Sequence, residues 1–445
     1  MKLVFSIVYF LFPAISLAAG GHGSSLHLDG SSLGLLWTFP FAGILLSIAI
    51  LPLVLPDFWH HNFGKISMFW GGLFIVPFLI YYGPNLTLYE VLHVALLEYI
   101  PFIVLLFALY TISGGVRLTG RLVGKPIVNV LILLIGTVLS SWMGTTGSAM
   151  LLIRPLINAN KHRKNIVHII VFFIFLVANI GGSLTPLGDP PLFLGFLKGV
   201  DFFWTTKFMF LPMLFMVISL LIVFFILDTI MYRKEPNLKI NDDEPLKLGI
   251  EGSFNLYLIL GVIAAVLMSG FWKPHLEFSV YHVPVQFQNI LRDLILLSLA
   301  YLSWSFTTQK IRVDNEFTWF PIVEVAKLFA GIFITIIPAI AILKAGPEGV
   351  LSFIIEAVSS TDTNNPEIVV QNNFMYFWLT GILSSFLDNA PTYLVFFNTA
   401  GGEEAVASLM ASGETLLAIS MGAVFMGANT YIGNAPNFMV KSISE

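Results

Sequence analysis

Two aspartates stand in apolar stretches that are long enough to lie within a membrane. Asp189 lies in the run 181–191 and Asp388 in the run 373–399. An ionised side chain at the centre of a bilayer costs several kcal/mol, so such residues usually bind ions or carry protons. Two carboxylates in one site repel each other, and a proton or a bound cation relieves that repulsion. Both are therefore candidate Na⁺ ligands; the alternative is that each caps a helix in a structural turn.

Neutral oxygens and amides gather in the same stretches. They can ligate sodium or donate hydrogen bonds to a carboxylate, although each can equally serve helix packing or capping. The candidates for ion or substrate binding are Asn179, Thr185, Asn389, Thr392, Asn429, Asn434 and Asn437, with Thr145, Thr146 and Ser148 around a first turn. Glu98 is a secondary candidate for a proton relay. Glu324 and Lys327 are also relay candidates, but their i,i+3 spacing favours a plain ion pair on one helix face.

The run GGSLTPLGDPP at 181–191 cannot form a continuous α-helix. Pro186, Pro190 and Pro191 lack a backbone N–H group, and the glycines lower the helix propensity. Inside a membrane, unwound backbone persists only where it is buried in protein or lines a wet cavity. Its free carbonyls and the N-terminus of the next half-helix are groups with which transporters hold ions and small charged solutes.

The composition is that of a membrane protein. The 445 residues are 57% hydrophobic and 11% charged, whereas soluble domains carry about a quarter charged residues. The net charge is −4 without a polybasic tail, which argues against nucleic acid as a partner. The sequence has no cysteine, and its nine histidines form no metal-binding motif. The sequence shows no nucleophile–base pair of the kind that would indicate an enzyme. No cofactor is expected beyond Na⁺ and H⁺ as transported or coupling ions.

Apolar segments of about 20 residues, enough to cross a bilayer, recur along the chain. They are 33–56, 64–82, 91–112, 166–200, 207–231, 254–272, 287–305, 320–343 and 415–440, with 166–200 and 415–440 interrupted. Segments 127–157 and 373–399 are apolar but broken halfway by small polar residues. Basic residues flank the first on both sides and acid-leaning loops flank the second, and Lys and Arg favour cytoplasmic loops. We therefore predict two re-entrant hairpins, the first from the cytoplasmic side and the second from the outer side.

The sequence around the two hairpins recurs in the same order. LSSWMGTTGS at 139–148 corresponds to LSSFLDNAPT at 383–392, and GDPPLF at 188–193 to GNAPNF at 433–438; we also match the AN at 178–179 with that at 428–429. Chance similarity of helix-packing residues is the alternative. Because the hairpins enter from opposite sides, we predict an all-α polytopic membrane protein, an inverted-repeat secondary transporter with two re-entrant hairpins and two broken helices.

This pattern predicts the layout of the chain. Residues 1–19 read as a signal peptide, with an uncleaved first helix as the alternative. The first repeat covers 33–231, a cytoplasmic linker 232–253, and the second, inverted repeat 254–445. No span in the second repeat matches 207–231, so we expect it to lack a final helix. The expected location is the bacterial inner membrane, multi-pass, with a periplasmic mature N-terminus.

At these residues the chain resembles the ion transporter superfamily, which includes NhaD-type sodium/proton antiporters, citrate and dicarboxylate carriers, and arsenite permeases. The resemblance runs from about residue 33 to the end and is most specific at GDPP in 188–191 and SSFLDNAPT in 384–392. It implies a homodimer with scaffold and transport domains, an elevator-like movement, and a site formed by both hairpin tips and both breaks. Carried over by position, these site residues are Asp189, Asn179, Asp388, Asn389 and Thr392.

The match departs from the antiporters at two places. Gly144, Thr145 and Thr146 stand where their first hairpin tip has acidic residues, and Pro190-Pro191 stand where they have threonines after the first Gly-Asp. The GDPP form looks closer to a branch of CitMHS-like citrate carriers or sodium/proton antiporters, which leaves the substrate open.

The leading hypothesis is sodium/proton antiport by alternating access, because two membrane carboxylates favour cations and no Lys or Arg falls at a hairpin tip or a helix break. The alternative is sodium- or proton-coupled uptake of citrate or a dicarboxylate, with the anion held by hydroxyls, amides and half-helix N-termini. A channel is disfavoured because hairpins on both sides indicate alternating access. The expected partners are small inorganic cations or a small carboxylate, the lipid bilayer and a second copy of the chain.

Overall fold

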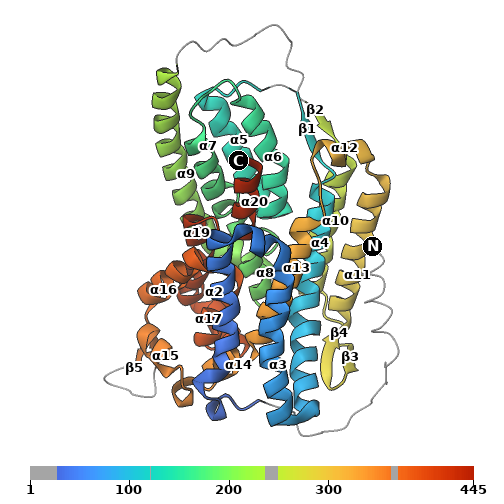
Figure 1. Cartoon of the computed structure of the whole chain (residues 1–445), viewed down its shortest axis with the longest axis vertical. Coiled ribbons are helices and arrows are strands. Elements are labelled where there is room, and N and C mark those ends of the chain that lie inside the picture. Colours follow the sequence, from blue (N-terminus) through green and yellow to red (C-terminus); the bar gives the residue numbers. More distant parts are fainter. Residues whose placement is uncertain (1–27, 121, 236–248, 362–368, 445) are drawn as a thin grey trace.

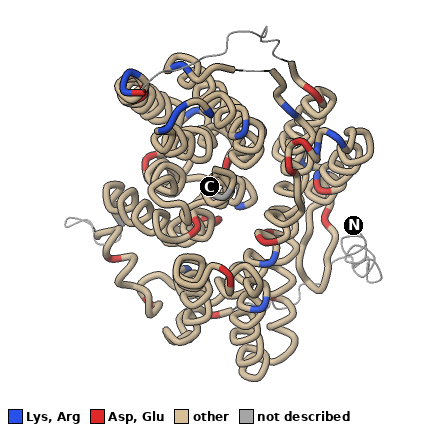
Figure 2. The backbone as a smooth tube through the Cα atoms, turned by 45° about the horizontal axis from the view of Figure 1, so that its top comes forward, with Lys and Arg blue, Asp and Glu red and all other residues tan. Residues whose placement is uncertain are grey.

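The computed structural model describes residues 28–120, 122–235, 249–361 and 369–444. The predicted signal peptide and most of the predicted linker lie outside that part of the chain. The rest is dominated by long apolar helices (Figure 1), and charged residues are sparse along the backbone (Figure 2). Within the described residues six helices are long and apolar enough to cross a membrane, or up to eight if each bent pair is one span. The chain is an all-α polytopic membrane protein, as the sequence predicts.

One set of helices, the wall helices, packs through a large apolar core. It comprises α2 (Phe39–Val54), α3 (Pro56–Val94), a π-type turn (Ala95–Tyr99), α4 (Ile100–Ser113), α10 (Phe254–Phe271), α11 (Phe287–Phe306), α12 (Gln309–Asp314), α13 (Phe320–Thr335) and α14 (Ile337–Lys344). The backbone of α3 turns at Gly83, whose φ of 79° suits glycine. This turn separates the two spans predicted at 64–82 and 91–112.

A second set, the hairpin helices, carries the predicted site. It comprises α5 (Pro126–Met143), α6 (Thr145–Ala159), α7 (Val167–Leu176), α8 (Pro190–Leu197), α9 (Phe202–Lys234), α16 (Asn373–Phe386), α17 (Asn389–Thr399), α18 (Gly402–Ser412), α19 (Glu414–Met426) and α20 (Ala435–Ser444). The sequence did not predict α18, which meets the following helix at an angle of 103°. A short helix α15 (Ser352–Val358) lies in the segment we expected to be a loop.

Three two-stranded antiparallel ribbons complete the described part of the fold. They are β1 (Arg117–Thr119) with β2 (Gly249–Glu251), β3 (Glu277–Val280) with β4 (Val283–Gln286), and β5 (Ser359–Thr361) with β6 (Val369–Gln371). The end of the molecule with β1, β2 and α12 is called the α12 end below, and the opposite end, with α14 and α15, the α15 end (Figure 1).

Two helical hairpins approach the centre of the molecule from opposite ends. Helices α5 and α6 meet at Gly144, whose φ of 80° ends one helix and starts the next. Helices α16 and α17 meet at Leu387 and Asp388. In Figure 1 the first hairpin extends from the centre towards the α12 end, whereas the second lies on the α15 side.

Each hairpin is tied to an interrupted helix by similar hydrogen bonds. The interruption between α7 and α8 holds a 3₁₀ turn (Ile180–Leu184), and that between α19 and α20 holds another (Gly427–Asn429). Ser140 Oγ donates to the carbonyl of Val177 over 2.7 Å, and Ser384 Oγ donates to that of Ala423 over 2.6 Å. Thr185 and Thr430 likewise donate to the carbonyls of Ser141 and Ser385.

These bonds correct one of the predicted repeat matches. Gly182 packs against Gly188 as Gly427 packs against Gly433. The spacing between these equivalent glycines pairs Asn179 with Val424, so the match of Asn179 with Asn429 was wrong. A two-residue match inside apolar sequence carries too little information to fix the register.

Candidate functional site

Asp189 is the centre of a polar cluster built from both halves of the chain. Its side chain is 1% exposed. Its carboxylate accepts hydrogen bonds from Thr145 Oγ1 at 3.2 Å, Asn434 Nδ2 at 2.8 Å and Asn389 Nδ2 at 2.6 Å. Thr145 begins α6, Asn389 begins α17 and Asn434 precedes α20. The structure thus brings together four of the residues that the sequence singled out.

The two prolines after Asp189 explain why its carboxylate is available to these partners. An aspartate just before a helix normally accepts from the N–H groups of the first turn. Pro190 and Pro191 have no such N–H group, and the N–H of Leu192 donates to the backbone carbonyl of Asp189 at 3.1 Å, so the Asp189 side chain makes no capping hydrogen bond to α8. The side chain therefore bonds across the halves of the molecule.

Asp388 behaves differently. It caps α17 by accepting from the backbone N–H of Ala390 at 3.0 Å, which is the structural alternative that we weighed for both aspartates. It nevertheless lines the same cavity as Asp189 and is 9% exposed. Asp388 therefore combines a capping bond with a position in the cavity wall.

Hydrogen bonds link Asn434 of the cluster to two further asparagines, Asn179 and Asn437. Asn434 Nδ2 also lies 3.2 Å from Asn179 Oδ1, and Asn179 Nδ2 donates to Asn437 Oδ1 over 2.6 Å. Asn437 Nδ2 then donates to the carbonyl of Gly427 over 2.9 Å. These bonds orient the amide that faces Asp189.

Backbone hydrogen bonds fix the hairpin tips against the helix breaks. The N–H of Thr145 donates to the carbonyl of Gly188 at 2.9 Å, and the N–H of Asn389 donates to that of Gly433 at 3.1 Å. The N-termini of α6, α8, α17 and α20 consequently converge on Asp189. Helix N-termini carry partial positive charge and favour anionic groups.

Two amide oxygens beside Asp189 are buried without a hydrogen-bond partner among the described residues. They are Asn389 Oδ1 and Asn434 Oδ1, whose nitrogens both donate to the carboxylate. A buried acceptor without a donor is costly, and such neutral oxygens next to a carboxylate are ligands that hard cations accept. The donor set therefore fits Na⁺.

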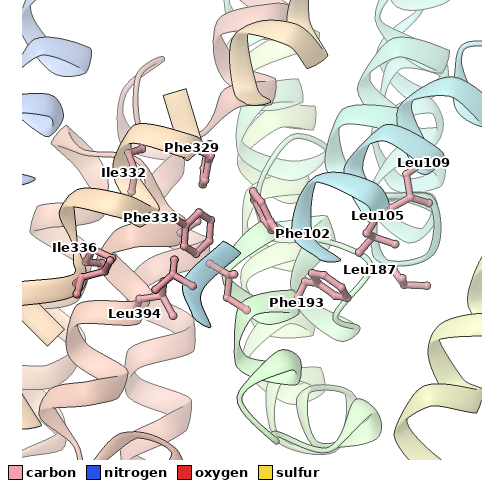
Figure 3. Packing of buried hydrophobic residues seen from close by; sticks show 14 of the residues in the cluster. Phe102, Leu105, Leu109, Leu187, Phe193, Phe329, Ile332, Phe333, Ile336 and Leu394 are labelled. Atoms are coloured by element: carbon pink, nitrogen blue, oxygen red, sulfur yellow. The ribbon is translucent and has the colours of Figure 1, made fainter. Parts of the chain in front are cut away.

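A cavity of about 410 Å³ lies between the hairpin tips and the wall helices α3, α4 and α13. Asp189, Asp388, Thr145, Thr146 and Asn434 line its polar side. Its apolar floor includes Phe102, Leu105, Leu109, Leu187, Phe193 and Phe329, which pack together in Figure 3. The rings of Phe102 and Phe329 lie 4.8 Å apart.

The α12 end of the cavity carries charged residues that sequence reasoning missed. Arg154 and Glu316 line it and form an ion pair of 2.9 Å, and His60 lies in the same lining. No Lys or Arg stands at a hairpin tip, as predicted, but Arg154 reaches the cavity from further along α6. The basic cluster after the first hairpin signalled cytoplasmic orientation only, because sequence does not reveal which basic side chain turns inward.

Other predicted residues lie outside the cluster. Thr392 Oγ1 donates to the carbonyl of Asp388 within α17, and Asn429 is exposed and donates to Ser385 Oγ. Ser148 is fully buried, and its hydroxyl has no partner among the described residues. Thr185 Oγ1 donates to the carbonyl of Ser141, as described above.

The three relay candidates have separate surroundings. Glu324 lines the cavity and accepts a hydrogen bond of 3.3 Å from Trp59 Nε1. Lys327 Nζ lies 5.4 Å from the centre of the Phe63 ring. Within the described chain no ion pair joins Glu324 to Lys327, so the ion pair that their i,i+3 spacing favoured was a wrong prediction. Glu98 lies outside the cavity lining and pairs with Lys198.

A family model described as "Putative citrate transport" matches residues 30–445. No curated protein matches the sequence.

Proposed function

The chain belongs to the "Putative citrate transport" family, and from this membership and the site we propose that it carries citrate or a related carboxylate across the membrane, coupled to Na⁺ or H⁺. The observation that carries the proposal is the set of groups at Asp189. One buried carboxylate, two amide oxygens without partners and four helix N-termini meet at one place.

The two kinds of group suit two kinds of solute. A cation bound by Asp189 with Asn389 Oδ1 and Asn434 Oδ1 neutralises the carboxylate. The converging helix N-termini are then left to attract an anion, which the carboxylate would repel while no cation is bound. Arg154 lies in the same cavity lining, paired with Glu316. Coupling follows from this order, because the anion binds well only after the cation. The cavity of about 410 Å³ falls within the range of about 300–1,000 Å³ typical of small-molecule sites.

Sodium/proton antiport is the second candidate. It is supported by the two aspartates in the cavity wall and by the fact that neither forms an ion pair with a Lys or Arg among the described residues. In that case Asp189 and Asp388 exchange a proton for sodium, and no anion is carried.

Labelled-citrate uptake into proteoliposomes separates the two candidates. We expect uptake when an inward Na⁺ or proton gradient is imposed, and a loss of uptake when the gradient is collapsed by an ionophore. The second measurement is the sodium-induced dissipation of a proton gradient in everted vesicles. Dissipation without citrate accumulation rejects carboxylate transport and supports antiport, whereas gradient-driven uptake of citrate rejects simple antiport.

A further inference from the structure

Lys198, Glu98 and Glu403 form an ion-pair cluster that the cavity does not reach. Lys198 Nζ lies 2.6 Å from Glu98 Oε1 and 2.6 Å from Glu403 Oε1. The side chains of Lys198 and Glu98 are 9% and 4% exposed, whereas that of Glu403 is 49% exposed. None of the three lines the cavity.

The cluster joins the two sets of helices. Lys198 follows directly after α8, the eight-residue helix that begins next to Asp189. Glu98 belongs to the π-type turn of the wall helices, and Glu403 to the first turn of α18. A shift of Lys198 relative to Glu98 is therefore a shift of α8, and with it of Asp189, relative to the wall.

The cluster and the cavity have different charged neighbours. The cavity lining includes Trp59, His60 and Glu316, whereas the electrostatic neighbours of the cluster include Lys344, the last residue of α14 at the α15 end. Phe102 and Phe193 line the cavity and belong to the packed apolar core shown in Figure 3. The charged lining of the cavity, Arg154 with Glu316, thus lies at the α12 end, whereas the ion-pair cluster lies outside the lining and near Lys344 of α14.

We propose that Lys198 is a positioning residue whose bond to Glu98 latches the transporter with its cavity facing the α12 end. The proposal rests on the transport function proposed above. Opening towards the α15 end requires α8 to leave the wall, which separates Lys198 from Glu98. Removing one partner of a buried ion pair leaves an uncompensated charge and is strongly unfavourable. Glu403 reduces this cost, because it lies among the hairpin helices and keeps Lys198 paired. The more exposed Glu403 thus makes the latch reversible.

The test uses the absence of cysteine from the sequence. Leu106 on α4 lines the cavity and is partly exposed, so Leu106→Cys gives one reporter thiol. A membrane-impermeant maleimide is applied to each face of the membrane in turn, using right-side-out and everted vesicles. In the otherwise unchanged protein the thiol is expected to react faster from the face of the α12 end.

In Leu106→Cys with Lys198→Met we expect the ratio of the two labelling rates to shift towards the opposite face by about tenfold, the effect of a change of about 1.4 kcal/mol between the two states. Lys198→Arg is expected to keep the original ratio, since it preserves the charge. Glu98→Gln is expected to shift the ratio in the same direction as Lys198→Met, with Lys198 still paired to Glu403.

Matched controls come from neighbouring surface residues. Lys207→Met makes the same substitution at an exposed lysine on α9, and Glu404→Gln changes the exposed carboxylate next to Glu403. Both should leave the ratio unchanged. If Lys198→Met does not yield a monodisperse protein, Glu98→Gln supplies the deciding measurement.

An unchanged labelling ratio in folded Lys198→Met, or in folded Glu98→Gln when the first does not fold, overturns the latch. A shift of equal size in Lys207→Met overturns it as well. The labelling needs no substrate, so failure of citrate uptake in every variant rejects the proposed substrate without changing this result. A normal citrate carrier with an unshifted ratio rejects the latch alone.

Discussion

Asp189→Asn is expected to lower gradient-driven citrate uptake strongly while the protein remains folded. The replacement is nearly isosteric, but it removes the charge and one of the two acceptor oxygens that serve Thr145, Asn389 and Asn434. At least one of these donors must then face an NH₂ group. Hydrogen bonds to charged groups contribute about 1.5–3 kcal/mol, and each 1.4 kcal/mol is about tenfold in affinity. We expect uptake at a fixed low Na⁺ concentration to fall about 100-fold.

The control for this prediction is Asp57→Asn, the same change at an exposed aspartate in the first turn of α3. It should keep both uptake and the thermal unfolding midpoint. Asp388→Asn is expected to have a smaller effect than Asp189→Asn, because an amide oxygen can still accept from Ala390 N–H. Uptake by Asp189→Asn at the rate of the unchanged protein would remove Asp189 from the proposed coupling site.

The meeting of Asp189 with Thr145, Asn389 and Asn434 could be predicted from the sequence for a physical reason. Prolines, glycines and small polar residues inside apolar segments mark where helices must break. The resemblance to the ion transporter superfamily then implies that the two sets of breaks and tips meet at one place. Local chemistry and the family resemblance together indicated which of these side chains would lie close to one another.

The remaining contacts depend on helix rotation, which sequence spacing alone does not give. Arg154 pairs with Glu316, 162 residues away, and Lys198 with Glu98, 100 residues away. Each of these side chains had other possible orientations on its helix. Asn429 illustrates the same limit: it has the right residue type near the second break, yet its side chain is exposed. Residue type shows what a position can do, whereas packing decides which neighbour it meets.

Gly188→Ala is expected to prevent the first helix break from folding. An added Cβ would lie 2.1 Å from the carbonyl oxygen of Gly182 and 2.6 Å from its carbonyl carbon. Both obstacles are backbone atoms, so no side-chain rotation relieves the clash. Moving Gly188 away would break its bond to the N–H of Thr145 and displace Asp189. Overpacking costs about 1–3 kcal/mol even where side chains can adjust, so we expect at least roughly 3 kcal/mol here, measured as a lower unfolding midpoint and a low yield in detergent.

The inverted repeat supplies an internal comparison for this prediction. Gly433→Ala should act in the same direction, because its Cβ would lie 2.4 Å from the carbonyl oxygen of Gly427. Gly72→Ala is the control, since no atom lies within 4 Å of its added Cβ and alanine raises the helix propensity by about 1 kcal/mol. Equal midpoints for Gly188→Ala and Gly72→Ala would show that the break is not packed as described. If Gly188→Ala instead folds normally and fails only in transport, close packing of the two glycines matters for movement of the break rather than for its formation.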